Sequence, residues 1–400
     1  MIHERNTLPA PARTQVALTD MVARFAQRAA AYDRSGEIAT DNLDDVRAAG
    51  LLGLTIARAD GGQEGGLRQI VEVIGTLAKG DPTTALIIGM HYLQHAVIAR
   101  ATHWPQAARK QVIETALHEG ALINALRVEP ELGTPSRGGL PGTRITWVDG
   151  RPRLNGRKIY STGSTALRWG TVWAATDEDA PRVGQVLVDL TLPGVSIERS
   201  WNQMGMRATG SHTMVFDNVE LPDTALVDLR APEEWHTRDG SLVVGHVLAI
   251  ACLYDGVARA ARDWLITFLH ERVPTALGKP LATLPRFQTL LGEIDALLMV
   301  NESLIETALT KAESGNYPSH EANLAKYVVT ENAIRSVELG LAAIGNPGLS
   351  QDNPLERHYR NVLCARIHTL RPMWRWPPQA RRHLIRGGRT VFRRLLFIHV

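Results

Sequence analysis

The spacing of apolar residues changes twice along this chain of 400 residues, and this change constrains the fold more than any other feature. Apolar residues recur at helical spacing at both ends of the sequence, whereas the middle consists of short β-branched runs separated by turn pairs such as Asp149-Gly150 and Asn155-Gly156. We therefore predict an α+β protein in four parts: an N-terminal helical domain (1–123), a central β-barrel or sandwich domain (124–232), a C-terminal helical bundle (233–369) and an atypical basic tail (370–400).

Composition restricts the classes of protein to consider. Hydrophobic residues make up 44% of the chain, charged residues 21%, and the net charge is +3, which is ordinary for an enzyme and gives no global field that favours nucleic acid. No signal-peptide core is visible and no apolar run approaches membrane-spanning length, so we expect a cytoplasmic protein without a membrane partner. The two cysteines, Cys252 and Cys364, are expected to be buried thiols.

The stretch 201–222 is the most distinctive in the sequence. It begins Met204-Gly205-Met206-Arg207, continues through a turn of small residues at 208–211, and enters a strand at Thr213-Met214-Val215-Phe216. As a pattern it closely resembles the signature of the acyl-CoA dehydrogenase superfamily, flavoenzymes whose central β-domain holds an isoalloxazine ring. The order helical, β, helical is also that of this fold, and similar motifs extend over most of residues 40–368.

The loop Arg127–Thr134 resembles the family's Thr-Glu-Pro-x-x-Gly-Ser loop. The resemblance implies that the backbone at Val128 lies along the flavin ring, and that Gly133 and Thr134 allow close approach to flavin and substrate. Without the other motifs, an ordinary junction between a strand and a loop would explain the same residues.

A second motif, Lys158–Gly163, resembles the family's Lys-x-Trp-Ile-Thr-Asn. Tyr160 replaces the usual tryptophan and is expected to pack an aromatic face against the flavin. The resemblance implies that Thr162 reaches the N5 edge of the ring, while Ser161 adds a hydroxyl where the family has an apolar residue.

Two further elements resemble the parts of the family that reach the adenine dinucleotide of a neighbouring subunit or its pyrophosphate. They contain Arg272 and Gln288, whose spacing is two residues longer than in the family, and the turn at Gly345 and Asn346. FAD is therefore the expected cofactor, with FMN as the alternative. No Gly-x-Gly-x-x-Gly follows a strand and no Cys/His set has zinc spacing, so we predict neither NAD nor a metal.

The family's catalytic base is missing. The resemblance places the usual glutamate in an x-Glu-Gly-Thr run just after the helix that begins near Pro354, and Thr369 occupies that position. A hydroxyl does not act as a base near neutral pH. The family's alternative base position falls near Gly245-His246, which also lacks a carboxylate.

This substitution resembles the flavin monooxygenases of the superfamily, in which reduced flavin reacts with oxygen and His and Ser side chains assist. His368, Ser161 and His91 are the catalytic candidates on that interpretation. Each has a structural alternative: His368 as a cap at a helix end, Ser161 as a strand hydroxyl and His91 as a packed core histidine. We rank His368 first and His91 last.

The segment 370–400 has many arginines and no acidic residue, whereas the family closes with an amphipathic helix. One interpretation is a basic tail that binds nucleic acid or an anionic membrane. We favour the other, out-of-frame sequence in place of the native helix, because the resemblance stops at His368-Thr369.

We therefore expect a flavin-dependent oxidoreductase of acyl-CoA dehydrogenase type, which transfers hydride between an acyl-thioester-like substrate and FAD although the usual glutamate is absent. A reduced-flavin-dependent monooxygenase, which would need a flavin reductase as partner, is the first alternative. A catalytically impaired flavin-binding homologue is the second. The expected partners are a small-molecule substrate, such as an acyl-CoA, and a second copy of the chain in a homodimer or homotetramer.

Overall fold

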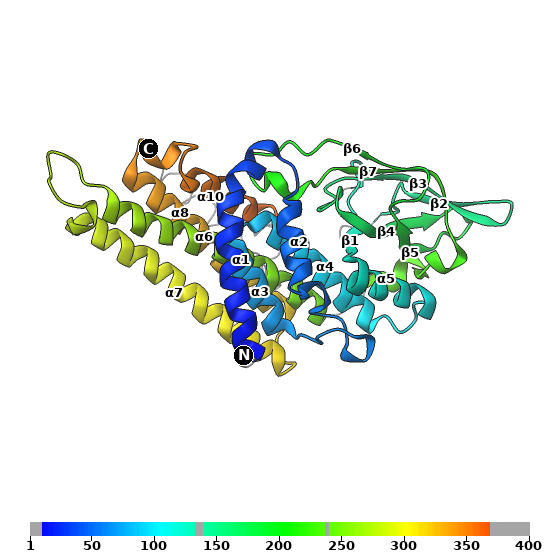
Figure 1. Cartoon of the computed structure of the whole chain (residues 1–400). Coiled ribbons are helices and arrows are strands. Elements are labelled where there is room, and N and C mark those ends of the chain that lie inside the picture. Colours follow the sequence, from blue (N-terminus) through cyan, green and yellow to red (C-terminus); the bar gives the residue numbers. More distant parts are fainter. Residues whose placement is uncertain (1–9, 133–138, 237–239, 369–400) are drawn as a thin grey trace, which may run out of the picture.

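The computed structural model describes residues 10–132, 139–236 and 240–368, and it places a helical bundle at one end of the molecule and a twisted sheet at the other (Figure 1). The chain begins with helices that stand between these two parts. Their apolar residues recur at helical spacing, which explains why they form here. These N-terminal helices are α1 (Ala10–Ser35), α2 (Thr40–Ala48), α3 (Leu67–Gly80), α4 (Pro82–Arg100) and α5 (Gln106–Glu119).

The described strands form one eight-stranded sheet, in which β1 pairs with β4 beside the path β6-β7-β3-β2-β4-β5-β8. The expected turn pair Asp149-Gly150 closes a hairpin: β2 and β3 pair antiparallel around these two residues, both with positive φ (51° and 77°). Helices α4 and α5 lie against the sheet, where Gln94 and Thr115 accept hydrogen bonds from β4. The strands are β1 (Leu122–Leu126), β2 (Arg144–Val148), β3 (Arg151–Lys158), β4 (Leu167–Thr176), β5 (Val183–Asp189), β6 (Val195–Glu198), β7 (Thr213–Glu220) and β8 (Asp228–Arg230).

After the sheet, the chain returns to long helices that make the bundle. They are α6 (Gly240–Glu271), α7 (Pro285–Glu313), α8 (Ser319–Ile344), α9 (Asn346–Leu349) and α10 (Pro354–Leu363), followed by the 3₁₀ turn η8 (Cys364–Arg366). The α+β fold class with helical, β and helical regions is thus confirmed.

Helix α6 corrects one expectation from the sequence. It is long and apolar enough to cross a membrane by length and composition alone, so the statement that no apolar run approaches that length was wrong. Most of α6 is buried in the bundle, where a helix surrounded by other helices is apolar on all sides.

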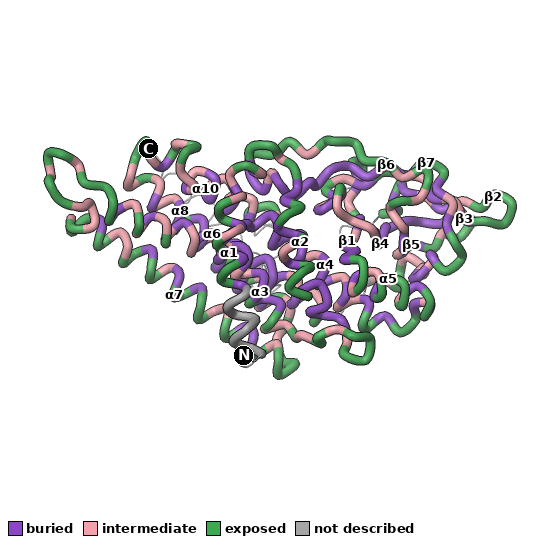
Figure 2. Tube along the Cα trace, in the orientation of Figure 1, coloured by how far each residue is buried: buried purple, intermediate pink, exposed green. Residues whose placement is uncertain are grey.

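The two helical regions share one hydrophobic core, which is the purple centre of Figure 2. Phe25 of α1, Leu77 of α3, Val257 of α6 and Ile334 of α8 all belong to it and are at most 1% exposed. Helices α3 and α6 cross so closely that a Cβ on Gly256 would lie 2.5 Å from a backbone carbonyl oxygen of α3. The sheet has a separate core, and Leu167 at the start of β4 packs against both cores.

The cysteines differ from each other in burial. Cys252 on α6 is buried as expected, whereas Cys364 at the end of α10 is only half-buried, and both are free thiols.

Candidate active site

A buried ion pair joins the two loops that the sequence assigns to the flavin. Lys158 Nζ donates to Glu129 Oε1 at 2.5 Å, and the two side chains are 0% and 3% exposed. Thr143 Oγ1 donates to the same carboxylate oxygen at 2.6 Å, and Gly142 N donates to the other. Burial opposes ionisation of Glu129, but these hydrogen bonds outweigh it and hold the pKa of the carboxyl below its usual value. The pair therefore keeps the loops in register with each other.

Next to this pair, the backbones of Val128 and Ile159 form an isolated antiparallel bridge. The bridge leads into Tyr160, which has a positive φ of 57° and a ring that is 59% exposed. A left-handed backbone is unusual for an aromatic residue and is a form of strain that concentrates at binding sites. The ring meets Trp201 edge to face, at 6.3 Å between centroids. This corner thus presents an aromatic face and a straight backbone edge.

Hydroxyl groups line the chain just beyond Tyr160. Thr162 Oγ1 lies 3.1 Å from Ser211 Oγ, which in turn lies 2.8 Å from Thr209 Oγ1. Ser161 is buried, and its hydroxyl donates to the Lys158 carbonyl at 3.3 Å. The structure therefore brings Thr162 together with the small-residue turn of the 201–222 stretch. The hydroxyls of Thr162, Ser211 and Thr209 form a polar group beside Tyr160.

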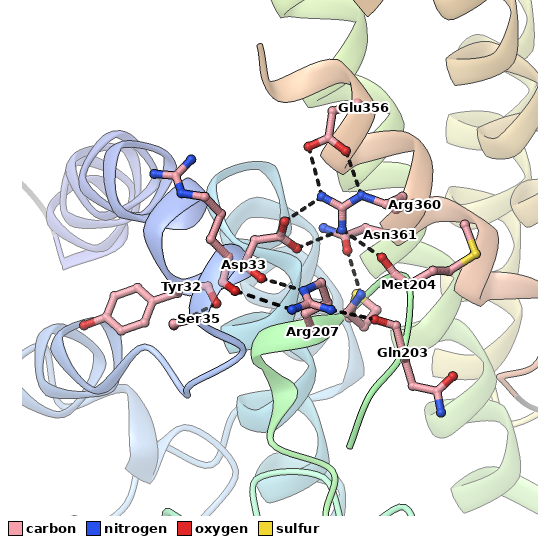
Figure 3. Close-up of polar contacts among 11 residues, drawn as sticks. Tyr32, Asp33, Ser35, Gln203, Met204, Arg207, Glu356, Arg360 and Asn361 are labelled. Carbon is pink, nitrogen blue, oxygen red and sulfur yellow. Dashed lines mark hydrogen bonds and ion pairs between the residues drawn. The ribbon is translucent and has the colours of Figure 1, made fainter. Parts of the chain in front are cut away.

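The other half of that stretch joins three parts of the molecule (Figure 3). Arg207 Nε donates to the carbonyl of Asp33 at the end of α1, at 2.7 Å. Arg360 of α10 bonds the Asp33 carboxylate, with NH1 at 3.1 Å and NH2 at 2.5 Å, and its NH1 also donates to the Met204 carbonyl at 2.8 Å. We call this set, Asp33, Met204, Arg207 and Arg360, the interdomain clamp.

Close backbone packing completes the clamp. A Cβ on Gly205 would lie 2.1 Å from the carbonyl oxygen of Arg360, so only glycine fits here. The resemblance associated the whole stretch with the β-domain that holds the flavin. The structure divides it: residues 204–207 connect α1 and α10 to the sheet, while Thr209 and Ser211 face Thr162.

His368 lies at the end of the segment that the clamp holds. Its Nδ1 is hydrogen-bonded to the hydroxyl of Tyr254 on α6, and its carbonyl accepts from Lys326 Nζ on α8 at 2.7 Å. Lys326 also donates to the Ala365 carbonyl at 3.1 Å. Sequence reasoning named His368 as a candidate, a role that stays a prediction, and it did not name Tyr254 or Lys326.

The electrostatic surroundings of His368 are basic. Burial, His246 and Lys326 lower the pKa of His368 to about 4, and burial, Arg127 and Lys326 do the same for His246. Within the described ranges, neither histidine is hydrogen-bonded or ion-paired to a carboxylate. Because Arg127 immediately precedes Val128, this cluster connects His368 to the loop that carries the Val128–Ile159 bridge.

His91 has different surroundings. It is fully buried on α4, its Nε2 is 3.0 Å from the Leu52 carbonyl, and its ring meets His95 at 4.5 Å between centroids. A carbonyl only accepts, so Nε2 carries the proton, and Nδ1 has no partner among the described residues. The role proposed for His91 in catalysis remains a prediction.

Comparison with known proteins shows the family of this chain. Models of the N-terminal, middle and C-terminal domains of acyl-CoA dehydrogenase match residues 12–110, 129–219 and 247–369. The acyl-CoA dehydrogenase-like protein YdbM of Bacillus subtilis is 34% identical over 342 residues, covering 84% of this chain and 88% of YdbM. The chain belongs to the acyl-CoA dehydrogenase family.

Solved structures with a similar fold include enzymes of two kinds. FMN-bound TdsC of Paenibacillus sp. A11-2, a dibenzothiophene monooxygenase, has a TM-score of 0.78 at 21% identity and covers 90% of this chain and 94% of its own. Butyryl-CoA dehydrogenase of Megasphaera elsdenii also has a TM-score of 0.78, at 20% identity, with 96% and 99% covered. At these identities the likeness shows the shared fold.

The loop between α6 and α7 and the end of α8, which carry the residues assigned to the dinucleotide half of a family cofactor, lie at the end of the bundle away from the sheet (Figure 1). Arg272 and Gln288 are exposed around the start of α7, and Gly345 and Asn346 are exposed where α9 begins. The structure therefore does not bring them together with Val128 in one chain. Gly133, Thr134, Thr369 and the segment 370–400 lie outside the described residues.

Proposed function

We propose that the chain binds a flavin ring between the loops joined by Glu129 and Lys158. The fit rests on three features of one corner: the Val128–Ile159 backbone bridge, the exposed ring of Tyr160 and the hydroxyl of Thr162. A flat polycyclic ring needs an apolar face to lie on and polar groups at its edge, and this corner supplies both. Bound flavin would supply the electron transfer for the reaction.

For the rest of the cofactor, we propose that Arg272, Gln288, Gly345 and Asn346 serve the flavin of a second copy of the chain. Their distance from Val128 in one subunit supports this, as does the exposed apolar face of the bundle at Leu324, Tyr327 and Val328. FAD would use this second set and FMN would not, so the two cofactors predict different dependence on assembly. A homodimer or homotetramer would complete the site.

We propose that the reaction is oxygenation by reduced flavin. The observation that carries this proposal is the basic cluster around His368, because a dehydrogenase needs a carboxylate there to remove a proton from its substrate. Here the groups that lower the pKa of His368 are His246 and Lys326, and Arg127 in turn lowers the pKa of His246. Such surroundings stabilise negative charge and disfavour uptake of a proton.

Each residue of the site would have a separate role in this reaction. Val128, Tyr160 and Thr162 would orient the ring. His368 would donate a hydrogen bond to the electronegative atom that gains charge, and Ser161 would orient the substrate. A separate flavin reductase would deliver the reduced cofactor, and the substrate would be a small organic molecule.

Dehydrogenation of an acyl thioester is the second candidate. The 34% identity to YdbM, over most of both chains, supports it. The resemblance places Thr369 at the position of the usual base, and on that reading this activity would need a carboxylate from another source. The oxygenase proposal requires no such addition.

An anaerobic titration separates these candidates. The purified protein, loaded with oxidised flavin, is mixed with acyl-CoA thioesters of several chain lengths, and its visible spectrum is recorded. We expect the oxidised spectrum to persist with every thioester. Bleaching with any of them would support dehydrogenation, and failure to retain either FAD or FMN would favour the impaired homologue.

A further inference from the structure

The hydrogen bond between Tyr254 and His368 fixes more than the position of a ring. Tyr254 is 0% exposed, and its hydroxyl bonds His368 Nδ1, with the two rings 5.8 Å apart and tilted by 36°. The hydroxyl makes no other hydrogen bond within the part of the chain that the structure describes. The direction of this single bond therefore decides which nitrogen of His368 carries a proton.

The hydroxyl must be the donor. If Nδ1–H donated to the tyrosine oxygen, the O–H of Tyr254 would be buried without an acceptor, and an unsatisfied buried donor is costly. Burial also raises the pKa of Tyr254 well above its usual value, so the O–H keeps its proton. Nδ1 then accepts, and a neutral imidazole with a bare Nδ1 carries its proton on Nε2.

The backbone of His368 is held independently. Lys326 Nζ donates to the carbonyls of Ala365 and His368, the last turns of the segment that follows α10. Lys326 is 6% exposed, and its charge lies close enough to His368 to oppose protonation of the imidazole. Side chain and main chain of His368 are thus fixed by two helices, α6 and α8.

We propose that Tyr254 and Lys326 are positioning residues that present His368 as a neutral imidazole with a fixed Nε2–H donor. His368 then donates to an atom that gains negative charge and does not remove a proton from the substrate. This assignment deepens the proposed function and rests on it for its role in turnover. The tautomer itself is a property of the protein alone.

The direct test is a measurement of which ring nitrogen of His368 carries the proton, made on the full chain without flavin. Nitrogen NMR of protein labelled with ¹⁵N in histidine distinguishes a protonated ring nitrogen from a bare one, and His368→Gln identifies the signal. We expect Nε2 protonated and Nδ1 bare at neutral pH. A protonated Nδ1, or rapid exchange between tautomers, would overturn the assignment, and this wild-type measurement needs no variant of Tyr254.

A pair of variants tests the part played by Tyr254. Tyr254→Phe removes only the hydroxyl, so we expect His368 to lose its single tautomer and to titrate at a different pH. Tyr92→Phe is the matched control, because Tyr92 is equally buried and its hydroxyl has no partner among the described residues. An unchanged His368 signal in Tyr254→Phe, or an equal change in Tyr92→Phe, would contradict the role of Tyr254.

Lys326 is tested by the same signal. Lys326→Met keeps most of the length of the side chain but removes the ammonium, so the His368 pKa should rise and its backbone amide should exchange faster with solvent. Lys311→Met, which removes an exposed lysine from α7, is the control. If the expected tautomer is found but the reduced protein does not oxygenate substrates, the proposed function fails and the positioning assignment stands.

Discussion

Asn361 Oδ1 accepts a hydrogen bond from the backbone N–H of Met206 at 2.7 Å. Asn361 is in the last turn of α10, and Met206 lies between the clamp residues Met204 and Arg207, so this bond connects the helix that leads to His368 with the sheet. Met206 has a positive φ of 53°, and the hydrogen bond from its N–H to Asn361 stabilises this backbone conformation. The position of His368 thus depends on a contact made well before it in the chain.

This relationship predicts the effect of changing Asn361. Asn361→Ala leaves the buried N–H of Met206 without an acceptor, which should lower the free energy of unfolding by about 1–3 kcal/mol. Asn361→Asp keeps an acceptor oxygen in place and should lower it by less. Urea unfolding of both variants checks this, and equal losses would show that the hydrogen bond is not the cause.

A second prediction concerns the buried ion pair. Glu129→Gln leaves Lys158 buried opposite a neutral group, so we expect a loss of about 3–5 kcal/mol and weaker flavin retention. The control is Glu198→Gln, which breaks the exposed pair with Arg157 and should cost less than about 1 kcal/mol. Denaturant unfolding measures both. A small loss in Glu129→Gln would mean that the pair does not hold the loops.

Assembly is tested at the exposed face of α8. Leu324, Tyr327 and Val328 are 47%, 43% and 37% exposed, and their spacing places them on one side of the helix. Leu324→Glu should shift the protein toward monomers in sedimentation velocity. Val148→Glu, at the exposed end of β2, should leave the distribution of species unchanged, and a monomeric wild type would refute the proposed assembly.

The buried histidines predict acid sensitivity. Burial lowers the pKa of His91 to about 4, and burial with Arg357 lowers that of His358 to about 3. The unfolded chain binds these protons near pH 6.5, so stability is fully present above that pH and falls as the pH drops toward 4. Each histidine adds a slope of up to about 1.4 kcal/mol per pH unit.

His358→Gln should therefore reduce this slope, while replacement of the exposed His320 should not. The free energy of unfolding, measured at several values between pH 4 and 7, tests the difference. A constant free energy over that range would contradict the prediction.

The sequence was informative where the signal is local. The β2–β3 hairpin follows from Asp149-Gly150, whose residues adopt the left-handed backbone that the turn requires. His368 was named from the sequence because it adjoins a recognisable motif, and its catalytic role stays a prediction. The division of the 201–222 stretch was not foreseen, since Arg207 bonds Asp33 across 174 residues.

Tyr254 and Lys326 were missed for a related reason. Helical periodicity indicates which face of a helix is buried but not which side chain from another helix it meets. One signal was available: Lys326 interrupts the apolar face of α8, and a buried lysine needs acceptors. Lys326 donates to the backbone carbonyls of Ala365 and His368. Every residue has such a carbonyl, so the sequence does not indicate which ones a lysine will meet.

The central claim is that this site uses reduced flavin to activate oxygen. Stopped-flow absorbance tests it most directly: protein loaded with reduced flavin is mixed with oxygenated buffer in the absence of acyl-CoA. We predict a transient band, distinct from both reduced and oxidised flavin, that decays faster in His368→Gln than in the wild type. Direct conversion to oxidised flavin without a transient, at the same rate in both proteins, would contradict the account.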